Sequence, residues 1–140
     1  PVETLKEKER EILMSVKFNI VKRGNPARPE APKKYYPSIQ SSGRMTMRRL
    51  AEEAARNSTL STADMMAAIE SFLTIIPREL ANGNIVELGD FGNFWLRSTS
   101  DGVESPDEVR GGQITSLIPR FNAGKEFKRV LSTVQFEKIP

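Results

Sequence analysis

Residues 88–97 read LGDFGNFWLR, in which two glycines flank a phenylalanine and alternating apolar and polar side chains follow. The preceding IVEL also alternates, so both flanks are typical of β-strands. Glycines spaced in this way either form a tight turn between strands or cradle a phosphate before a helix. Because no helix start follows them, the hairpin turn is favoured over the phosphate loop. The alternation then predicts Phe94 and Leu96 on one face of the second strand, with Trp95 and Arg97 on the other.

Two amphipathic helices are predicted before this hairpin. Thr46 is expected to cap the first, and Ser61 to cap a longer second helix, with Asp64 three residues later completing a capping box. Pro77 inside the second helix predicts a kink, and Gly83 is the expected C-terminal cap. The second helix carries an apolar stripe at helical spacing, formed by Met66, Ile69, Leu73, Ile76 and Leu80.

The two ends of the chain read as strands. The alternation in residues 15–23 predicts a strand, the proline-rich residues 24–34 an extended basic loop, and YYPSIQSS an edge strand, since Pro37 cannot donate to a ladder. After a polar stretch, ITSLIP predicts a further strand. A short last helix is expected to start near Asn122 or Ala123. The final TVQFEKI alternates again, with Val134 and Phe136 expected inward, and can pair with the first strand.

Composition limits the chemistry that the chain can perform. Its 140 residues fit one domain, or one domain with an appendage, and they include no cysteine and no histidine. The absence of both residues excludes disulfides, thiol catalysis, zinc sites of the usual ligand types, and catalytic Ser–His or Cys–His arrangements. No apolar run predicts a membrane span or a signal peptide. We expect no enzyme activity, metal, cofactor or small-molecule substrate.

Charge is distributed unevenly along the chain. Residues 14–50 hold nine Lys/Arg and one acidic residue, whereas residues 51–113 hold four Lys/Arg and eleven acidic residues. Such asymmetry can mark a basic face for a polyanion, or it can be solvated surface charge that is spread unevenly.

The element order from residue 46 onward, with GDFGNF and IPRFNAGKEFK, resembles the HU and integration host factor family of bacterial nucleoid proteins. The strands added at both ends resemble the larger HU-like proteins of the Bacteroides group. The resemblance implies an α+β fold: an intertwined homodimer with a helical base, a β-sheet saddle and β arms that clasp the DNA minor groove, here with extra terminal strands. The matching positions are Gly89, Phe91, Gly92, Phe94, Phe121, Gly124 and Lys125.

This resemblance implies four segments. Residues 1–13 are an N-terminal extension with no assigned function, and 14–45 are an N-terminal strand with the proline-rich linker. Residues 46–132 are the HU-like DNA-binding domain, and 133–140 are a C-terminal strand.

The implied function is sequence-independent binding and condensation of double-stranded DNA by a histone-like protein of the cytoplasmic nucleoid. The alternative is a protein-interaction or structural module on an HU-like fold that has lost most of its DNA affinity, which the acidic arm motivates. The resemblance implies DNA contacts by Arg97, Arg110, Arg120, Lys125, Lys128 and Arg129.

The arm departs from the family pattern. Family arms are rich in arginine and end in a proline that wedges between base pairs. Pro106 is the candidate wedge here, but four acids and one arginine surround it, so we expect it to contribute little. The acids are Asp101, Glu104, Asp107 and Glu108.

Overall fold

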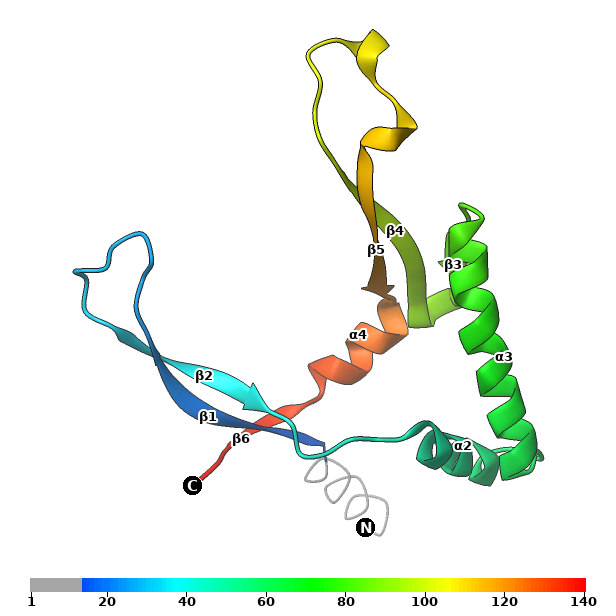
Figure 1. Ribbon diagram of the computed structural model, residues 1–140. Helices are drawn as coiled ribbons and strands as arrows, with labels where there is room; N and C mark the ends of the chain where they lie inside the picture. The colour runs from blue at the N-terminus through cyan, green and yellow to red at the C-terminus, as the bar shows by residue number, and fades with distance from the viewer. Residues whose placement is uncertain (1–13) are drawn as a thin grey trace. The chain divides into compact units, whose positions relative to one another are not determined.

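The computed structural model describes residues 14–140, and the predicted N-terminal extension lies outside these residues (Figure 1). Two compact units are present: residues 14–45 with 130–140, and residues 46–129. Helices and two three-stranded sheets make the chain α+β, as predicted.

The first unit is a three-stranded sheet. Strand β1 (Ser15–Arg23) lies in its centre, β2 (Lys34–Gln40) pairs with it antiparallel, and β6 (Gln135–Lys138) pairs with it in parallel. Pro37 therefore lies in an edge strand, and the last strand pairs with the first, so both predictions are confirmed.

The register of this sheet separates apolar and polar side chains. Phe18 pairs with Ile39, and Val16 pairs with Phe136, so these four residues share one face. Ile39 is 68% exposed and Phe136 is 66% exposed. The expectation that Phe136 points inward is therefore wrong, because the described part of this unit is a single layer without a second layer over that face.

Helices α2 (Met47–Arg56) and α3 (Thr62–Ala81) begin where the caps predict. The Arg49 amide donates to Thr46 Oγ1 at 3.2 Å. The Asp64 amide donates to Ser61 Oγ at 3.1 Å, and the Ser61 amide donates to an Asp64 carboxylate oxygen at 3.4 Å. These two bonds complete the predicted capping box. Helix α3 continues past Pro77, and its end is followed by Gly83 at φ +88°, as expected of a C-terminal glycine.

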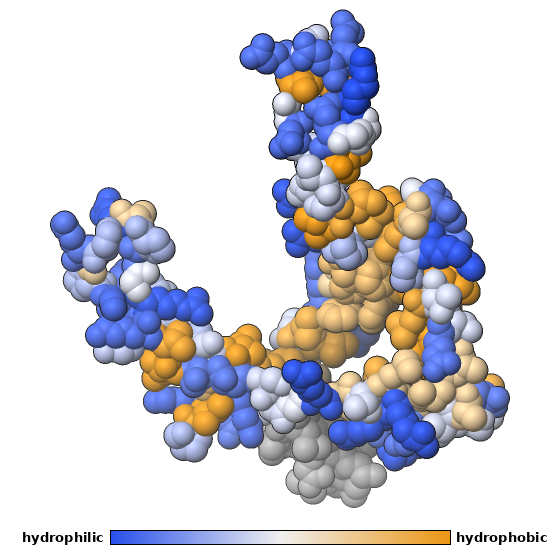
Figure 2. Space-filling view, viewed as in Figure 1, coloured by the Kyte–Doolittle hydropathy of each residue, from blue (hydrophilic) through white to orange (hydrophobic). Residues whose placement is uncertain are grey.

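The helices leave several large apolar side chains exposed. Ala51 and Leu80 are the buried hydrophobic residues among those described, whereas Phe72 and Leu73 on α3 remain 59% and 58% exposed. Figure 2 shows hydrophobic surface beside β4 and over part of α3, and mostly hydrophilic surface over the arm. Of the predicted stripe on α3, Leu73 is exposed, Met66, Ile69 and Ile76 are half-buried, and Leu80 is buried.

The opening stretch forms the predicted hairpin. Strand β3 (Val86–Glu87) is followed by a 3-10 turn at Gly89–Phe91 and by β4 (Gly92–Ser100), which pairs with β3 and with β5 (Ile114–Ala123). Helix α4 (Lys125–Ser132) follows β5 directly. The expected helix start near Asn122 or Ala123 is wrong, because these two residues still pair with β4.

Two glycines allow close approach of backbones around this turn. A Cβ on Gly92, whose φ is +146°, would lie 2.3 Å from the Asn122 carbonyl oxygen, and one on Gly124 would lie 2.2 Å from the Asp90 carbonyl oxygen. The Gly124 amide donates to the Phe91 carbonyl at 2.8 Å. The GDFG turn thus fixes the point at which α4 begins.

Aromatic side chains hold the same junction together. The Phe121 ring lies 5.4 Å from that of Phe91, 4.9 Å from that of Phe94 and 5.6 Å from that of Phe127. Phe127 comes from α4 and also contacts Phe91, with ring centroids 5.2 Å apart. The cluster packs the turn, the β4–β5 ribbon and the first half of α4 into one body.

Candidate nucleic-acid interface

The β4–β5 ribbon has two chemically distinct faces. Its register pairs Phe94 with Phe121 and Leu96 with Pro119, and these four lie on the aromatic side just described. The opposite side, which we call the arginine face, consists of Asn93, Trp95, Arg97, Ile118, Arg120 and Asn122. The predicted facing of this strand is confirmed.

Two of the predicted site residues share the arginine face. Arg97 pairs in register with Ile118, and Arg120 pairs with Trp95, so the two arginines are diagonal neighbours across the strands. Both side chains belong to exposed residues, and neither forms an ion pair within residues 14–140. Their charges are available to an anion that approaches this face.

Trp95 lies between these arginines on the same face. It is the single tryptophan of the chain, and its indole Nε1 is buried without a hydrogen-bond partner among the described residues. Alternation places Trp95 beside Arg97, but no sequence signal indicates the orphaned donor. The fluorescence of Trp95 can therefore report binding at the arginine face.

The start of α4 brings two further cations onto one exposed helix. Lys125 is its first residue and Lys128 follows one turn later, and neither is ion-paired among the residues that the structure describes. The backbone amides of a first helical turn and nearby basic side chains both favour phosphate. The Gly124–Phe91 hydrogen bond and the phenylalanine cluster hold these lysines in place.

Arg129, on the same helix, is differently placed. Its guanidinium forms a two-pronged ion pair with the Glu126 carboxylate, three residues earlier. The hydrogen bond from Arg129 lowers the pKa of Glu126, and the same bond raises the pKa of Arg129. Arg129 therefore offers less uncompensated charge to a phosphate than Lys125 or Lys128.

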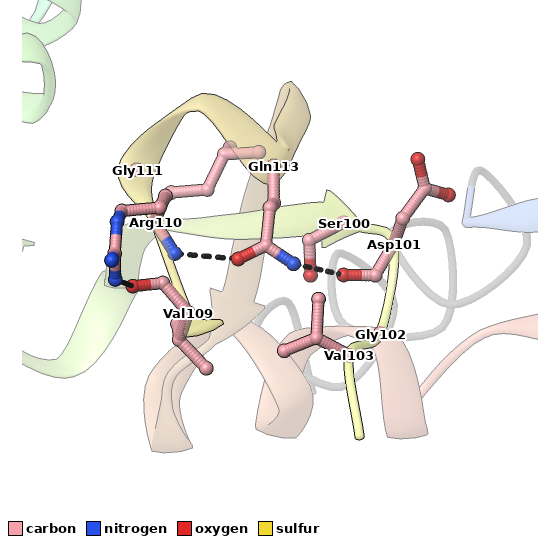
Figure 3. A pocket seen from close by; sticks show the side chains of 9 residues that line it. Ser100, Asp101, Gly102, Val103, Val109, Arg110, Gly111 and Gln113 are labelled. Atoms are coloured by element: carbon pink, nitrogen blue, oxygen red, sulfur yellow. Dashed lines mark hydrogen bonds between the residues drawn. The ribbon is translucent and has the colours of Figure 1, made fainter. Parts of the chain in front are cut away.

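Arg110 lies in the arm, the connection between β4 and β5 at residues 101–113 (Figure 3). Its Nη1 donates to the carbonyl oxygens of Asp107 and Val109, at 2.7 and 3.0 Å. Its amide donates to Gln113 Oε1 at 2.5 Å, and Gln113 Nε2 donates to the Asp101 carbonyl at 3.1 Å (Figure 3). Arg110 thus braces the arm tip, a role that sequence reasoning does not reveal.

Pro106 opens a short 3-10 turn, Pro106–Glu108, in that tip. The Val109 amide closes the turn by donating to the Pro106 carbonyl at 3.3 Å. Four exposed acids accompany it, so the structure places the candidate wedge within an acidic surface, at Asp101, Glu104, Asp107 and Glu108.

Comparisons with known proteins bear on the family and the fold of the chain. A family model described as HU-HIG, "HU domain fused to wHTH, Ig, or Glycine-rich motif", matches residues 14–138. The DNA-binding protein HRm of Rhizobium meliloti (strain 1021) is 32% identical over 92 residues, which cover 60% of this chain and 96% of that protein.

Two solved structures share the fold. A putative bacterial DNA-binding protein from Bacteroides vulgatus superposes with a TM-score of 0.60 at 13% identity, over 89% of this chain. This chain spans about half of that protein, 48% of its length. The HU chain of an Anabaena HU–DNA cocrystal superposes with a TM-score of 0.50 at 22% identity, over 63% of this chain and 98% of that chain.

Proposed function

The chain belongs to the HU-HIG family, and we propose that it binds double-stranded DNA without sequence preference, as an architectural protein of the nucleoid. The observation that carries this proposal is the exposed arginine face, where Arg97 and Arg120 flank Trp95 without a carboxylate partner. Contacts between such cations and phosphates give affinity and register but no base information. Lys125 and Lys128 extend the surface onto α4.

The binding species is a homodimer. One chain leaves Phe72, Leu73 and Ile75 of α3 exposed, and the same face of a second copy is the natural cover for them. A dimer also doubles the number of arginine faces that one DNA duplex can meet. DNA-binding proteins of this kind are architectural, so the proposal includes no catalytic step.

The proposed location is the nucleoid, where the DNA is. No helix that the structure describes is both long enough and apolar enough to cross a membrane.

The double variant Arg120→Ala/Lys125→Ala tests the site. We expect weaker binding to unrelated duplexes by similar factors, since phosphate contacts carry no sequence information. The slope of log K against log salt should fall by about 1.8 per protomer, because each lost contact removes about 0.9. Titration followed by Trp95 emission measures both quantities.

The matched control is Arg48→Ala/Arg56→Ala. These arginines lie on α2 and are ion-paired with Glu52 and Glu53, at 3.5 and 2.5 Å. The control removes the same formal charge but should leave the salt slope near that of the wild type. An equal loss in both variants would remove the arginine face and the α4 start from the interface. Wild-type protein that leaves Trp95 emission unchanged and retards no duplex at low salt would refute the proposed function itself.

The arm is predicted to contribute little to bending. Pro106→Ala should leave both DNA affinity and bending nearly unchanged, because the acids around the proline oppose approach to phosphates. Replacing Glu104, Asp107 and Glu108 by lysine should raise affinity, and more at low salt than at high, since each repulsion costs on the order of 1 kcal/mol when screening is weak. Fluorescence transfer between labelled duplex ends reports bending. A large loss for Pro106→Ala would show that the arm wedges DNA despite its charge.

A further inference from the structure

The β1–β2 hairpin of the first unit is strongly basic. Across residues 15–40 it carries six Lys/Arg and one acid, Glu30. All six are exposed. We call these six cations the basic hairpin: Lys17, Lys22, Arg23, Arg28, Lys33 and Lys34.

No cation of the basic hairpin forms an ion pair with any residue that the structure describes. The arginines of α2 differ, because Arg48 and Arg56 each have a glutamate partner. Lys22 instead lies over the Tyr35 ring, with its Nζ 5.6 Å from the ring centroid, an arrangement that orients the ammonium without neutralising it.

The sheet register brings two of these cations together. Arg23 and Lys34 are directly opposite on neighbouring antiparallel strands. Like charges in such a pair destabilise the hairpin unless an anion compensates them. Lys17 points to the same face as Arg23, and this is the face opposite the apolar Phe18 and Ile39. An uncompensated cationic row on the polar face of a sheet is typical of a surface that meets a polyanion.

The loop between the two strands is folded rather than extended. The Ala27 amide donates to Asn25 Oδ1 at 2.9 Å, and the Arg28 amide donates to the Asn25 carbonyl at 3.0 Å. The Ala31 amide in turn donates to the Arg28 carbonyl at 3.0 Å. These consecutive turns hold Arg28 in the connection between the strands. The loop therefore loses little conformational entropy when it binds a partner.

We propose that the basic hairpin is a second DNA-contacting surface of the chain, which binds backbone phosphates of duplex DNA. This inference rests on the proposed function. Duplex DNA presents one negative charge per about 1.7 Å. The polar face of the hairpin offers it Lys17, Arg23 and Lys34, and the connecting loop adds Arg28 and Lys33, whereas Lys22 lies beside Tyr35 on the opposite face. Phosphate contacts need no pocket and no base readout, which fits an exposed surface.

The acidic arm tip of another molecule is the competing occupant. It offers four carboxylates, and Arg110 contributes an opposing charge. The duplex supplies a longer and denser array of anions, so DNA is the occupant that the charges favour.

The test is the double variant Arg23→Gln/Lys34→Gln in the full chain, compared with Arg48→Gln/Arg56→Gln. Both remove the same formal charge, but only the first removes charges without a carboxylate partner. Removing the opposed Arg23–Lys34 pair also relieves a repulsion, so the melting temperature should not fall.

We expect the hairpin variant to bind DNA at low salt at least about tenfold more weakly than the control variant. Its salt slope should be smaller by about 1.8 per protomer. Trp95 emission at saturation should match that of the wild type, because the arginine face is still occupied. Equal affinity and equal slope in the two variants would overturn the inference while leaving the proposed function intact. The inference would also be overturned if the hairpin variant bound DNA as the wild type does but no longer formed assemblies larger than a dimer in sedimentation. That result would identify the arm tip of another molecule as the occupant of the basic hairpin.

Discussion

Gly92→Ala is expected to lower the free energy of unfolding of residues 46–129 by about 3 kcal/mol or more. The added Cβ would lie 2.3 Å from the Asn122 carbonyl oxygen and 2.7 Å from Phe121 Cζ. Neither neighbour can move easily, because Asn122 belongs to the paired β5 strand and Phe121 packs against three other rings. The φ of +146° adds backbone strain, since side-chain-bearing residues rarely adopt it.

Urea unfolding followed by circular dichroism measures this loss, with Gly102→Ala as the control. Gly102 lies in the arm, where an added Cβ would meet no atom within 4 Å. The control should therefore unfold at nearly the same urea concentration as the wild type. A Gly92→Ala protein within about 1 kcal/mol of the wild type would mean that the turn and β5 do not approach as closely as the structure places them.

Local chemistry made much of this fold predictable. The hydroxyl caps at Thr46 and Ser61 fix both helix starts, because each satisfies amides that no helical bond can reach. Period-two alternation likewise predicts that Arg97 and Trp95 share a face of β4. Such signals involve residues close in sequence, so one chain read in order is enough to find them.

The two wrong predictions both depend on residues that are distant in the sequence. The sequence predicts the start of α4 too early, because the pairing of Asn122 and Ala123 with β4 overrides their helical context. Phe136 was expected inward, but alternation only says which residues share a face and not whether another layer covers that face. Both errors come from tertiary structure that no local pattern encodes.

The candidate site also combines features that nearby residues in the sequence predict with features that only the folded chain shows. The Glu126–Arg129 spacing of three residues is a readable sign of an ion pair within a helix, and it distinguishes Arg129 from Lys125. The bonds from Arg110 to the carbonyls of Asp107 and Val109 depend on how the arm tip folds, so its bracing role could not be read from composition. Charge counting found the basic N-terminal segment, but only the strand register shows Arg23 opposite Lys34.

Leu73→Asp is expected to dissociate the proposed homodimer and to unfold the chain at micromolar concentration. Leu73 lies in the middle of the α3 stripe and is 58% exposed in one chain, beside Phe72 at 59%. In a two-fold interface each copy would bury one unpaired carboxylate. Each should cost about 3 kcal/mol or more, so the dimer loses about 6 kcal/mol, a factor of about 10⁴ in its dissociation constant.

Ser71→Asp is the matched control, because Ser71 is exposed on the same helix, 200° of helical rotation away from Leu73 by the 100° spacing of residues. Its added carboxylate stays in water, so this variant should remain a dimer in sedimentation velocity. The melting temperature of the wild type should rise with protein concentration, as expected when folding and association are coupled. A separated chain has little to hold it together, since Ala51 and Leu80 are the buried hydrophobic residues among those described. A Leu73→Asp protein that sediments as a folded dimer would place the interface elsewhere, and a wild type that sediments as a folded monomer would refute the dimer.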